Sequence, residues 1–267
     1  SRAKPIAMAR RPADQLSLKC VGILDETPIV KTFRFVPENA LMPKYQPGQH
    51  IRIGVDVGSS IEHRCYTLSS SPSRPAFLSI TVKKEGLVSS ALHDTMRIGD
   101  RITATTPIGQ FHLMAKPAAK ILLLSAGSGI TPFLSMLTWM ADTDISFDVV
   151  FDVSFPTMAD AIASQELVLI EKQLGSRLRI ERRFTQQGHD RIDRTAIIDI
   201  CPDIRERAVY ACGPASYINV VRTALASIEG FDLRNLLIES FGGSALPTGA
   251  DTDLGALRDE VFQLRFT

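Results

Sequence analysis

The sequence has few cysteines and no pattern that pairs them. Its 267 residues include four, Cys20, Cys65, Cys201 and Cys212, and no two of them form a Cys-x-x-Cys motif. This spacing argues against a zinc site or an iron–sulfur cluster held within the chain. Scattered single thiols favour a reducing compartment, so we expect a cytoplasmic protein with no metal site of its own.

Long apolar segments and an excess of one charge are also lacking. No hydrophobic run approaches the roughly 20 residues that cross a bilayer, and the net charge is +1. This balance gives no indication of nucleic acid or an anionic membrane as a partner. The start, SRAKPIAMARRPADQ, is polar and basic without the apolar core of a signal peptide. We therefore expect residues 1–14 to form a flexible leader.

Short alternating apolar segments dominate residues 15–115. Phe33 and Phe35 lie two residues apart and so share one face of a predicted strand. A Pro-Gly turn at Pro47 and Gly48 precedes another alternating segment. Because little helix separates these strands, we predict a small antiparallel β-barrel.

Residues 116–241 have a different pattern. The run KILLLSAG is continuously apolar, which is typical of a central parallel strand buried on both faces. Further strands, FDVVFDV, SRLRIERRF, RAVYACG and NLLIESF, follow it with helical segments between them. This alternation predicts an α/β domain with a doubly wound parallel sheet. A chain of 267 residues is long enough for both domains.

The segment GSGITP interrupts the chain where the buried strand ends. Gly127 and Gly129 remove side chains at the turn, while Thr131 can cap the next helix and Pro132 fits its first turn. A helix N-terminus with bare amides binds anions, and in a parallel sheet this edge is where nucleotides bind. A tight strand-to-helix turn without a ligand is the alternative for this segment alone.

Two segments of the first domain suggest a second nucleotide. In RCYTLSSSP, we expect Arg64, Tyr66 and the hydroxyl of Thr67 to lie in one row on a strand face, which suits a flavin nucleotide. In EGLVSSALHD, glycine and small hydroxyl residues open a short helix whose free amides could hold a pyrophosphate. An ordinary exposed strand and a plain helix cap are the alternatives.

Two further segments end strands of the second domain. In YACGP, a buried strand breaks at a glycine and Pro214 starts a helix. A single cysteine here is usually a core residue, but at the mouth of a sheet Cys212 could touch a reacting ring. In IESFGG, Glu239 and Phe241 point the same way because side chains in a strand alternate.

The order of these segments, from Arg-x-Tyr-Thr through Gly-x-x-Ser, GSGITP and CGP to ESF, resembles the ferredoxin–NADP reductase superfamily over residues 16–241. The resemblance implies that the barrel binds FAD, with Arg64 at its diphosphate, Tyr66 against its ring system and Thr67 near N5. The α/β domain would bind NAD(P)H, with the 127–132 turn at its pyrophosphate and the 212–214 segment near the nicotinamide. The implied catalytic residues are Thr67, Cys212 and Glu239. The implied cofactor-binding residues are Arg64, Cys65, Tyr66, Thr67, Val82, Gly86, Val88, Ser89, Ser90, Gly127, Gly129, Thr131, Pro132, Cys212, Gly213, Pro214 and Phe241.

The resemblance also implies an activity. NAD(P)H would pass a hydride to FAD, and the flavin would release the two electrons singly. Residues 242–267 read as a linker, GGSALPTGADTDLGA, followed by an alternating strand that contains VFQLRFT. This looks like reductases whose plant-type [2Fe-2S] ferredoxin domain follows at the C-terminus. We therefore expect 242–267 to be the linker and first strand of such a domain, which the chain does not contain. The implied acceptor is a Rieske-type oxygenase or a hybrid cluster protein.

The segment expected to bind the ribose of the nicotinamide nucleotide differs from that of many relatives. After the second strand of the α/β domain the sequence reads FDVSFPTMAD, without the arginine that often meets the 2′-phosphate of NADPH. Asp152 could instead accept a hydrogen bond from a free ribose, which favours NADH. Arg182 and Arg183 could still reach a phosphate, so both nucleotides stay open.

Other readings also stay open. FMN could replace FAD, although the Ser89–Ser90 segment suits a pyrophosphate. The chain could instead be an electron-channelling subunit without turnover of its own, as in a dihydroorotate dehydrogenase, but the scattered cysteines argue against it. A nucleotide-binding module whose flavin site has decayed is the third reading.

Overall fold

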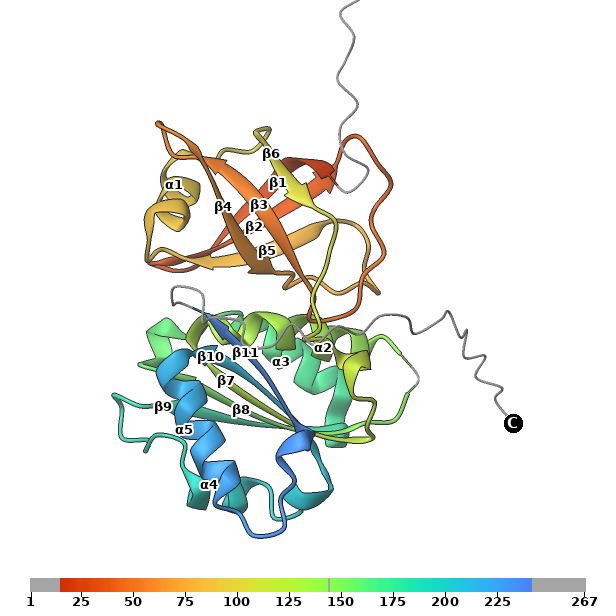
Figure 1. The fold of residues 1–267 in the computed structure, drawn as a ribbon, viewed down its shortest axis with the longest axis vertical. Coiled ribbons are helices and arrows are strands. Elements are labelled where there is room, and N and C mark those ends of the chain that lie inside the picture. The colour runs from red at the N-terminus through yellow and green to blue at the C-terminus, as the bar shows by residue number, and fades with distance from the viewer. Residues whose placement is uncertain (1–14, 144, 242–267) are drawn as a thin grey trace, which may run out of the picture.

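The computed structural model describes residues 15–143 and 145–241. Figure 1 shows an antiparallel domain, coloured red to yellow, stacked on an α/β domain coloured green to blue. The leader predicted at 1–14, the linker at 242–267 and its strand lie outside the described residues. Within the part of the chain that the structure describes, no helix is both long and apolar enough to cross a membrane.

The first domain is a six-stranded antiparallel sheet with the strand order β4-β3-β6-β1-β2-β5. A bridge between Leu68 and Ile80 joins the end of β4 to β5 and so connects the two edges. Phe33 and Phe35 are fully buried inside it, which confirms the predicted antiparallel barrel. The helix α1 (Leu87–Thr95) follows β5. The strands are β1 (Gln15–Thr27), β2 (Val30–Pro37), β3 (His50–Asp56), β4 (Ile61–Thr67), β5 (Leu78–Lys83) and β6 (Arg101–Thr105).

The second domain is a five-stranded parallel sheet with the order β11-β10-β7-β8-β9. Its hydrophobic residues pack on both faces, with α2 and α3 on one side and α4 and α5 on the other. The predicted doubly wound α/β domain is therefore confirmed. The strands are β7 (Lys120–Ala126), β8 (Asp148–Phe155), β9 (Leu178–Phe184), β10 (Ala208–Pro214) and β11 (Leu236–Phe241). The helices are α2 (Thr131–Ala141), α3 (Ser164–Leu174), α4 (Arg194–Ile200) and α5 (Ala215–Ala226).

The strand order defines where a ligand can enter the second domain. From β7 the chain builds outward through β8 and β9, then returns to the other side of β7 to form β10 and β11. In such sheets the crevice lies outside the carboxyl ends of the two strands at the point of reversal. Here those are β7 and β10, which end at the GSG turn and at the CGP segment.

Direct hydrogen bonds join the two domains. Arg74 of the barrel binds the carboxylate of Asp142 through two nitrogen atoms, at 2.8 and 2.7 Å. Ser135 of α2 donates to the carbonyl of Ser70 at 2.7 Å. These contacts hold the barrel over the carboxyl edge of the parallel sheet (Figure 1).

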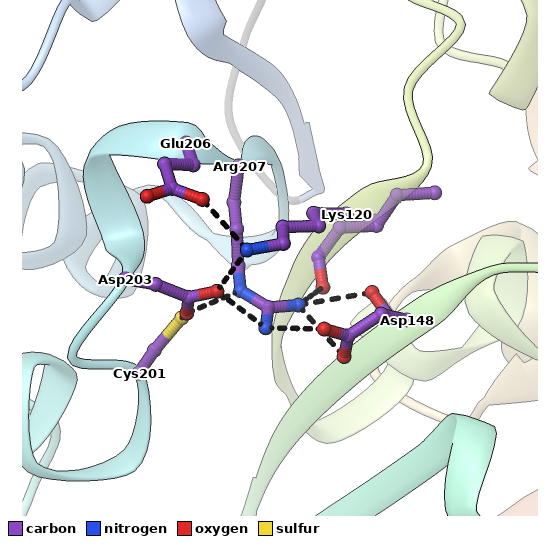
Figure 2. A network of polar contacts seen from close by, with 7 residues as sticks. Lys120, Asp148, Cys201, Asp203, Glu206 and Arg207 are labelled. Carbon is purple, nitrogen blue, oxygen red and sulfur yellow. Dashed lines mark hydrogen bonds and ion pairs between the residues drawn. The ribbon is translucent and has the colours of Figure 1, made fainter.

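The opposite edge of the parallel sheet carries a network of charged side chains (Figure 2). The Arg207 side chain is only 5% exposed and its guanidinium lies between the carboxylates of Asp148 and Asp203. It also donates to the Ile121 carbonyl at 3.3 Å. Lys120 binds Asp203 from the other side at 3.1 Å. The network joins the first residues of β7 and β8 to the segment before β10, so it fixes the end of the sheet that is remote from the crevice.

Candidate functional site

The turn after β7 brings two strands of the parallel sheet into close approach. Gly127 has a φ of 56° and open space where a side chain would lie. A Cβ at Gly129 would overlap the carbonyl of Cys212 and would lie 2.8 Å from the Cα of Gly213. Only glycine allows this approach, which places the bare backbone of the turn beside the end of β10.

The role expected of Thr131 and Pro132 changes. Residues 127–130 form a short 3-10 turn, η2 (Gly127–Ile130), and α2 starts at Thr131 without a break. The Thr131 hydroxyl donates to the carbonyl of Ser128 at 3.1 Å instead of accepting an amide. Proline has no amide hydrogen and both side chains are buried. The Thr131 amide also donates to the Ser128 carbonyl. The amides that can face an anion are therefore those of residues 127–129, so the backbone role stays with the predicted Gly127 and Gly129 and does not extend to Thr131 and Pro132.

A cleft of about 450 Å³ opens at this edge of the sheet. The GSG turn and Pro214 form one part of it, and Ser154 with Tyr217 forms another. From the barrel, the hairpin at Thr27–Val30 and the side chain of Lys83 complete the wall. The cleft therefore runs along the carboxyl ends of the strands and reaches the barrel, which suits an elongated nucleotide.

Glu239 lies where the two domains meet. The hydroxyl of Thr67 donates to its carboxylate at 3.1 Å, and the thiol of Cys212 lies 3.9 Å from the same oxygen. The Nδ1 atom of His50 is 3.9 Å from the other carboxylate oxygen. Residues far apart in the sequence thus converge, and the three predicted catalytic residues are brought together.

Burial controls the protonation of this cluster. It raises the pKa of Glu239 to about 7, against the opposing effect of hydrogen bonds from Thr67 and Cys212. Burial also raises the pKa of the Cys212 thiol and lowers that of His50. Near neutral pH the carboxyl can hold or release a proton beside a neutral thiol and a neutral imidazole. His50 was not expected from the sequence, although it pairs directly with Thr67 across β3 and β4.

The raised pKa of Glu239 predicts a pH dependence of stability. The folded state holds the proton until about pH 7, whereas the unfolded carboxyl loses it near 4.5. The wild-type protein should therefore lose stability relative to Glu239→Gln as pH rises through this window, with no further change above it. Urea unfolding of both flavin-free proteins at several pH values measures the difference. A difference that stays constant across the window would contradict the assignment.

The prediction that Arg64, Tyr66 and Thr67 share one face of β4 holds for the first two residues only. Arg64 and Tyr66 are two residues apart and share a face, but Thr67 is out of phase with them. The charges of Arg64 and Glu85 act on Tyr66, whereas those of Arg52 and Glu239 act on Cys65. Cys65 and Thr67 therefore face the Glu239 cluster, and the prediction of one row was wrong because strand alternation separates neighbours.

The side chains of this face are available to a ligand. Arg64 is exposed; its guanidinium donates to the adjoining carbonyl of His63 at 2.7 Å and lies 3.8 Å from the carboxylate of Glu62. The Tyr66 ring is half-buried and packs on the barrel core. A cation and a flat ring thus lie together on a strand whose far end meets Glu239.

The segment around Gly86 forms the N-terminus of α1. The Ser89 hydroxyl accepts from the amides of Glu85 and Gly86 at 3.0 and 2.9 Å, which shapes the turn. The amide of Ser90 already donates to the Gly86 carbonyl at 2.8 Å, so it is not free for a pyrophosphate as expected. Val88 is buried, and the first-turn amides of residues 87–89 lack partners in the helix. These amides and Arg64 fit the diphosphate of a flavin nucleotide.

Two predicted residues sit behind the surface instead of on it. Val82 is 1% exposed in the barrel core, and its carbonyl accepts from the ring of His93 at 2.8 Å. Phe241 packs partly against the core of the α/β domain and pairs with Pro214 in the register of β10 and β11. Gly213 in β10 is also buried, whereas the next residue, Pro214, is exposed and lines the cleft.

Asp152 cannot accept a hydrogen bond from a ribose as expected. Its side chain is 0% exposed, and one oxygen accepts from Arg183 at 2.6 Å. Burial still raises the pKa of Asp152 to about 6, against the opposing charge of Arg183. Arg182 is bound to Glu171 at 2.8 Å. Neither the Asp152 carboxylate nor the two arginines line the cleft. Arg183 is held by Asp152 within the sheet, and Arg182 is held by Glu171 of α3 on the other face.

These features define a class of protein. A barrel with a cation, an aromatic ring and free helix amides is joined to a nucleotide cleft at a shared carboxyl, thiol and hydroxyl cluster. That is the arrangement of a flavin- and nicotinamide-dependent oxidoreductase. Comparison with known proteins agrees: residues 25–113 match the oxidoreductase FAD-binding domain family and residues 123–223 match the oxidoreductase NAD-binding domain family.

The chain belongs to the family of oxidoreductases that join an FAD-binding and an NAD-binding domain, and it has the ferredoxin–NADP reductase fold. It is 34% identical over 247 residues to the glycine betaine monooxygenase reductase subunit of Chromohalobacter salexigens, covering 89% of this chain and 67% of that protein. It is 32% identical to the stachydrine N-demethylase reductase subunit of Rhizobium meliloti, covering 86% and 67%. The FAD/NAD-binding domain of a Vibrio cholerae nitric oxide dioxygenase superposes with a TM-score of 0.76 at 27% identity, covering 86% of this chain and all of that one.

The chain is therefore an NAD(P)H–FAD oxidoreductase related to reductase components of oxygenase systems. It spans about two thirds of the length of the curated relatives that it matches.

Proposed function

We propose that this protein takes a hydride from NAD(P)H onto FAD and passes the electrons singly to a [2Fe-2S] centre that serves a terminal oxygenase. The observation that carries the proposal is the contact of Thr67 with Glu239 and Cys212. These three residues come from the predicted flavin strand and from the two strands at the nicotinamide end of the cleft. A hydride donor and a hydride acceptor bound to these elements would meet at one point.

When bound, FAD supplies the chemistry that accepts an electron pair and releases single electrons. The chain itself supplies placement. Tyr66 would support the ring system, and Arg64 with the first-turn amides of α1 would hold the diphosphate. The Thr67 hydroxyl would lie near N5 of the ring, with the Glu239 carboxyl behind it as a proton reservoir. The amides of the GSG turn would orient the dinucleotide along the cleft.

We assign residues 15–115 as the FAD-binding domain and residues 116–241 as the NAD(P)-binding domain. The division into an antiparallel and a parallel sheet supports this boundary. The [2Fe-2S] centre would belong to a ferredoxin domain, either fused beyond the tail or separate. A Rieske-type oxygenase or a hybrid cluster protein is the proposed final acceptor, and the names of the relatives support the oxygenase.

We also propose a cytoplasmic location. All four cysteines are unpaired thiols in the described structure, and three of them are buried. Structural disulfides are rare in a reducing compartment.

Arg64→Ala should weaken FAD binding by about tenfold, since a charge-assisted hydrogen bond to the diphosphate would be lost. Titration of the flavin-free protein with FAD, followed by the quenching of flavin fluorescence, measures the affinity. Arg101→Ala is the matched control, because Arg101 is similarly exposed on the barrel but bound to Glu38. Equal affinity of both variants would argue against the flavin face on β4.

The acceptor is tested by adding a purified plant-type [2Fe-2S] ferredoxin and NADH or NADPH to the FAD-loaded protein. The proposal predicts that the ferredoxin becomes reduced only when this protein is present. If flavin reduction occurs but the ferredoxin stays oxidised, the iron–sulfur part of the proposal fails and the NAD(P)H–FAD reaction stands.

A further inference from the structure

The Arg183 side chain is held back from the nucleotide cleft. In the register of β8 and β9, Arg183 lies opposite Ser154, and Ser154 lines the cleft. The Arg183 guanidinium nevertheless turns back along the sheet to Asp152, with an Nε–Oδ2 distance of 2.6 Å. The backbone of Arg183 therefore lies beside a residue that lines the cleft, but its guanidinium is bound to Asp152, two residues before Ser154 in β8.

The ion pair between Asp152 and Arg183 is buried, and burial makes it costly to separate. The Asp152 side chain is 0% exposed and that of Arg183 is 15% exposed. Separating two buried opposite charges leaves each without its partner, which proteins tolerate poorly. The ordinary state of Arg183 is therefore the paired one.

The part of the cleft wall next to the Asp152–Arg183 pair contains polar groups without hydrogen-bond partners among the described residues. The Ser154 hydroxyl and the Tyr217 hydroxyl are both buried without a hydrogen-bond partner among the described residues. Both residues line the cleft. The second oxygen of Asp152 also lacks a partner. Both hydroxyls can exchange hydrogen bonds with the free hydroxyl groups of a ribose. The negative charge of the nearby Asp152 carboxylate opposes a doubly charged phosphate.

We propose that Asp152 lowers the affinity of this cleft for a 2′-phosphorylated dinucleotide by holding Arg183 out of it. The inference rests on the proposed function, because it assumes that a nicotinamide dinucleotide binds in this cleft. Asp152 is then a specificity-determining residue that acts through Arg183 and makes no contact with the ribose. Freed from Asp152, Arg183 could extend toward Thr185 and Gln186, which line the cleft just beyond it.

The test measures NADP⁺ and NAD⁺ binding to the full chain by calorimetry, which needs no turnover. Asp152→Asn should bind NADP⁺ at least about tenfold more tightly than the wild type does, about 1.4 kcal/mol, with NAD⁺ affinity changed by less than about threefold. An unchanged ratio of the two affinities would overturn the inference. If neither dinucleotide binds the wild type, the proposed function fails first, so the two failures are distinguishable.

Two further variants keep the test decisive. Glu171→Gln frees Arg182, whose partner Glu171 belongs to α3 on the other face of the sheet, and should not raise NADP⁺ affinity. Arg183→Gln should leave NADP⁺ affinity within about threefold of the wild type, because the native Arg183 does not reach the phosphate. A selective loss of about tenfold or more in Arg183→Gln would overturn the inference even if Asp152→Asn does not fold.

Discussion

A Gly129→Ala variant is expected to reduce bound FAD with NAD(P)H about 100-fold more slowly than the wild type, since misplacing reactants by about 1 Å can cost this much. The added methyl group would overlap the Cys212 carbonyl and press on Gly213. Both obstacles are backbone atoms, which cannot rotate away as a side chain would. The β7 turn and the end of β10 must therefore separate, and this moves the nucleotide amides relative to Cys212 and Glu239. Single-turnover mixing of the FAD-loaded variant with NADH or NADPH measures the rate.

Gly127→Ala is the matched control for this prediction. Its Cβ would meet no atom within 4 Å, although the φ of 56° imposes a strain of roughly 1–2 kcal/mol on a non-glycine residue. We expect lower stability but a rate of flavin reduction within about tenfold of the wild type. If Gly129→Ala reduces its flavin as fast as Gly127→Ala does, close packing of β7 on β10 does not position the reaction.

An Arg207→Met variant should lose about 3 kcal/mol of unfolding free energy. The change removes the guanidinium from between Asp148 and Asp203 and leaves two carboxylates facing one another (Figure 2). It also leaves the Ile121 carbonyl without its donor. This value is at the lower end of the cost of removing one partner from a buried ion pair, because the Asp148 side chain is 54% exposed. Urea unfolding measures the loss, and Arg234→Met is the control. Among the described residues the exposed Arg234 pairs with Asp232 alone, and an exposed ion pair contributes little to stability.

The same network gives a pH dependence. Hydrogen bonds from Arg207 and Lys120 hold the pKa of Asp203 well below its usual range, although partial burial opposes them. A carboxyl with a lowered pKa contributes stability above its unfolded pKa, near 3.9, and loses it as the pH falls further. The advantage of the wild type over Arg207→Met should therefore be full above about pH 5 and shrink in more acidic solution. An advantage that grows on acidification would contradict the ion-pair account.

The sequence located most of the segments that form the site, because glycine and buried strands leave clear local signals. The GSG turn, the CGP segment and Glu239 were placed from the ends of apolar runs, and the parallel sheet brings all three to one edge. The two sheet types were likewise readable from the change in periodicity near residue 116. Such signals depend on a few consecutive residues and need no knowledge of their partners.

The errors concern side chains whose environment is set by other strands. Thr67 was placed in the row of Arg64 and Tyr66, although strand alternation and its hydrogen bond to Glu239 put it on the other face. Asp152 was expected in the cleft, but its side chain is buried within β8, where it pairs with Arg183 of the neighbouring strand. No local pattern shows such a pairing.

His50 illustrates a residue that local reading overlooks. It follows a Pro-Gly turn at the start of β3, and nothing in its own segment indicates chemistry. The register with Thr67 and the packing of the two domains bring its ring to 3.9 Å from the Glu239 carboxylate. Contacts of this kind need the pairing of strands and the docking of domains, which a single sequence does not specify.

The central claim is that the two domains bring a nicotinamide and a flavin together at the Thr67–Glu239–Cys212 cluster. Anaerobic rapid mixing of the FAD-loaded protein with NADH, and separately with NADPH, tests it most directly by following the visible absorbance of the flavin. The account predicts that at least one nucleotide bleaches the flavin within a single turnover. A protein that binds FAD and a dinucleotide at equilibrium, yet leaves the flavin oxidised with both nucleotides, would contradict it.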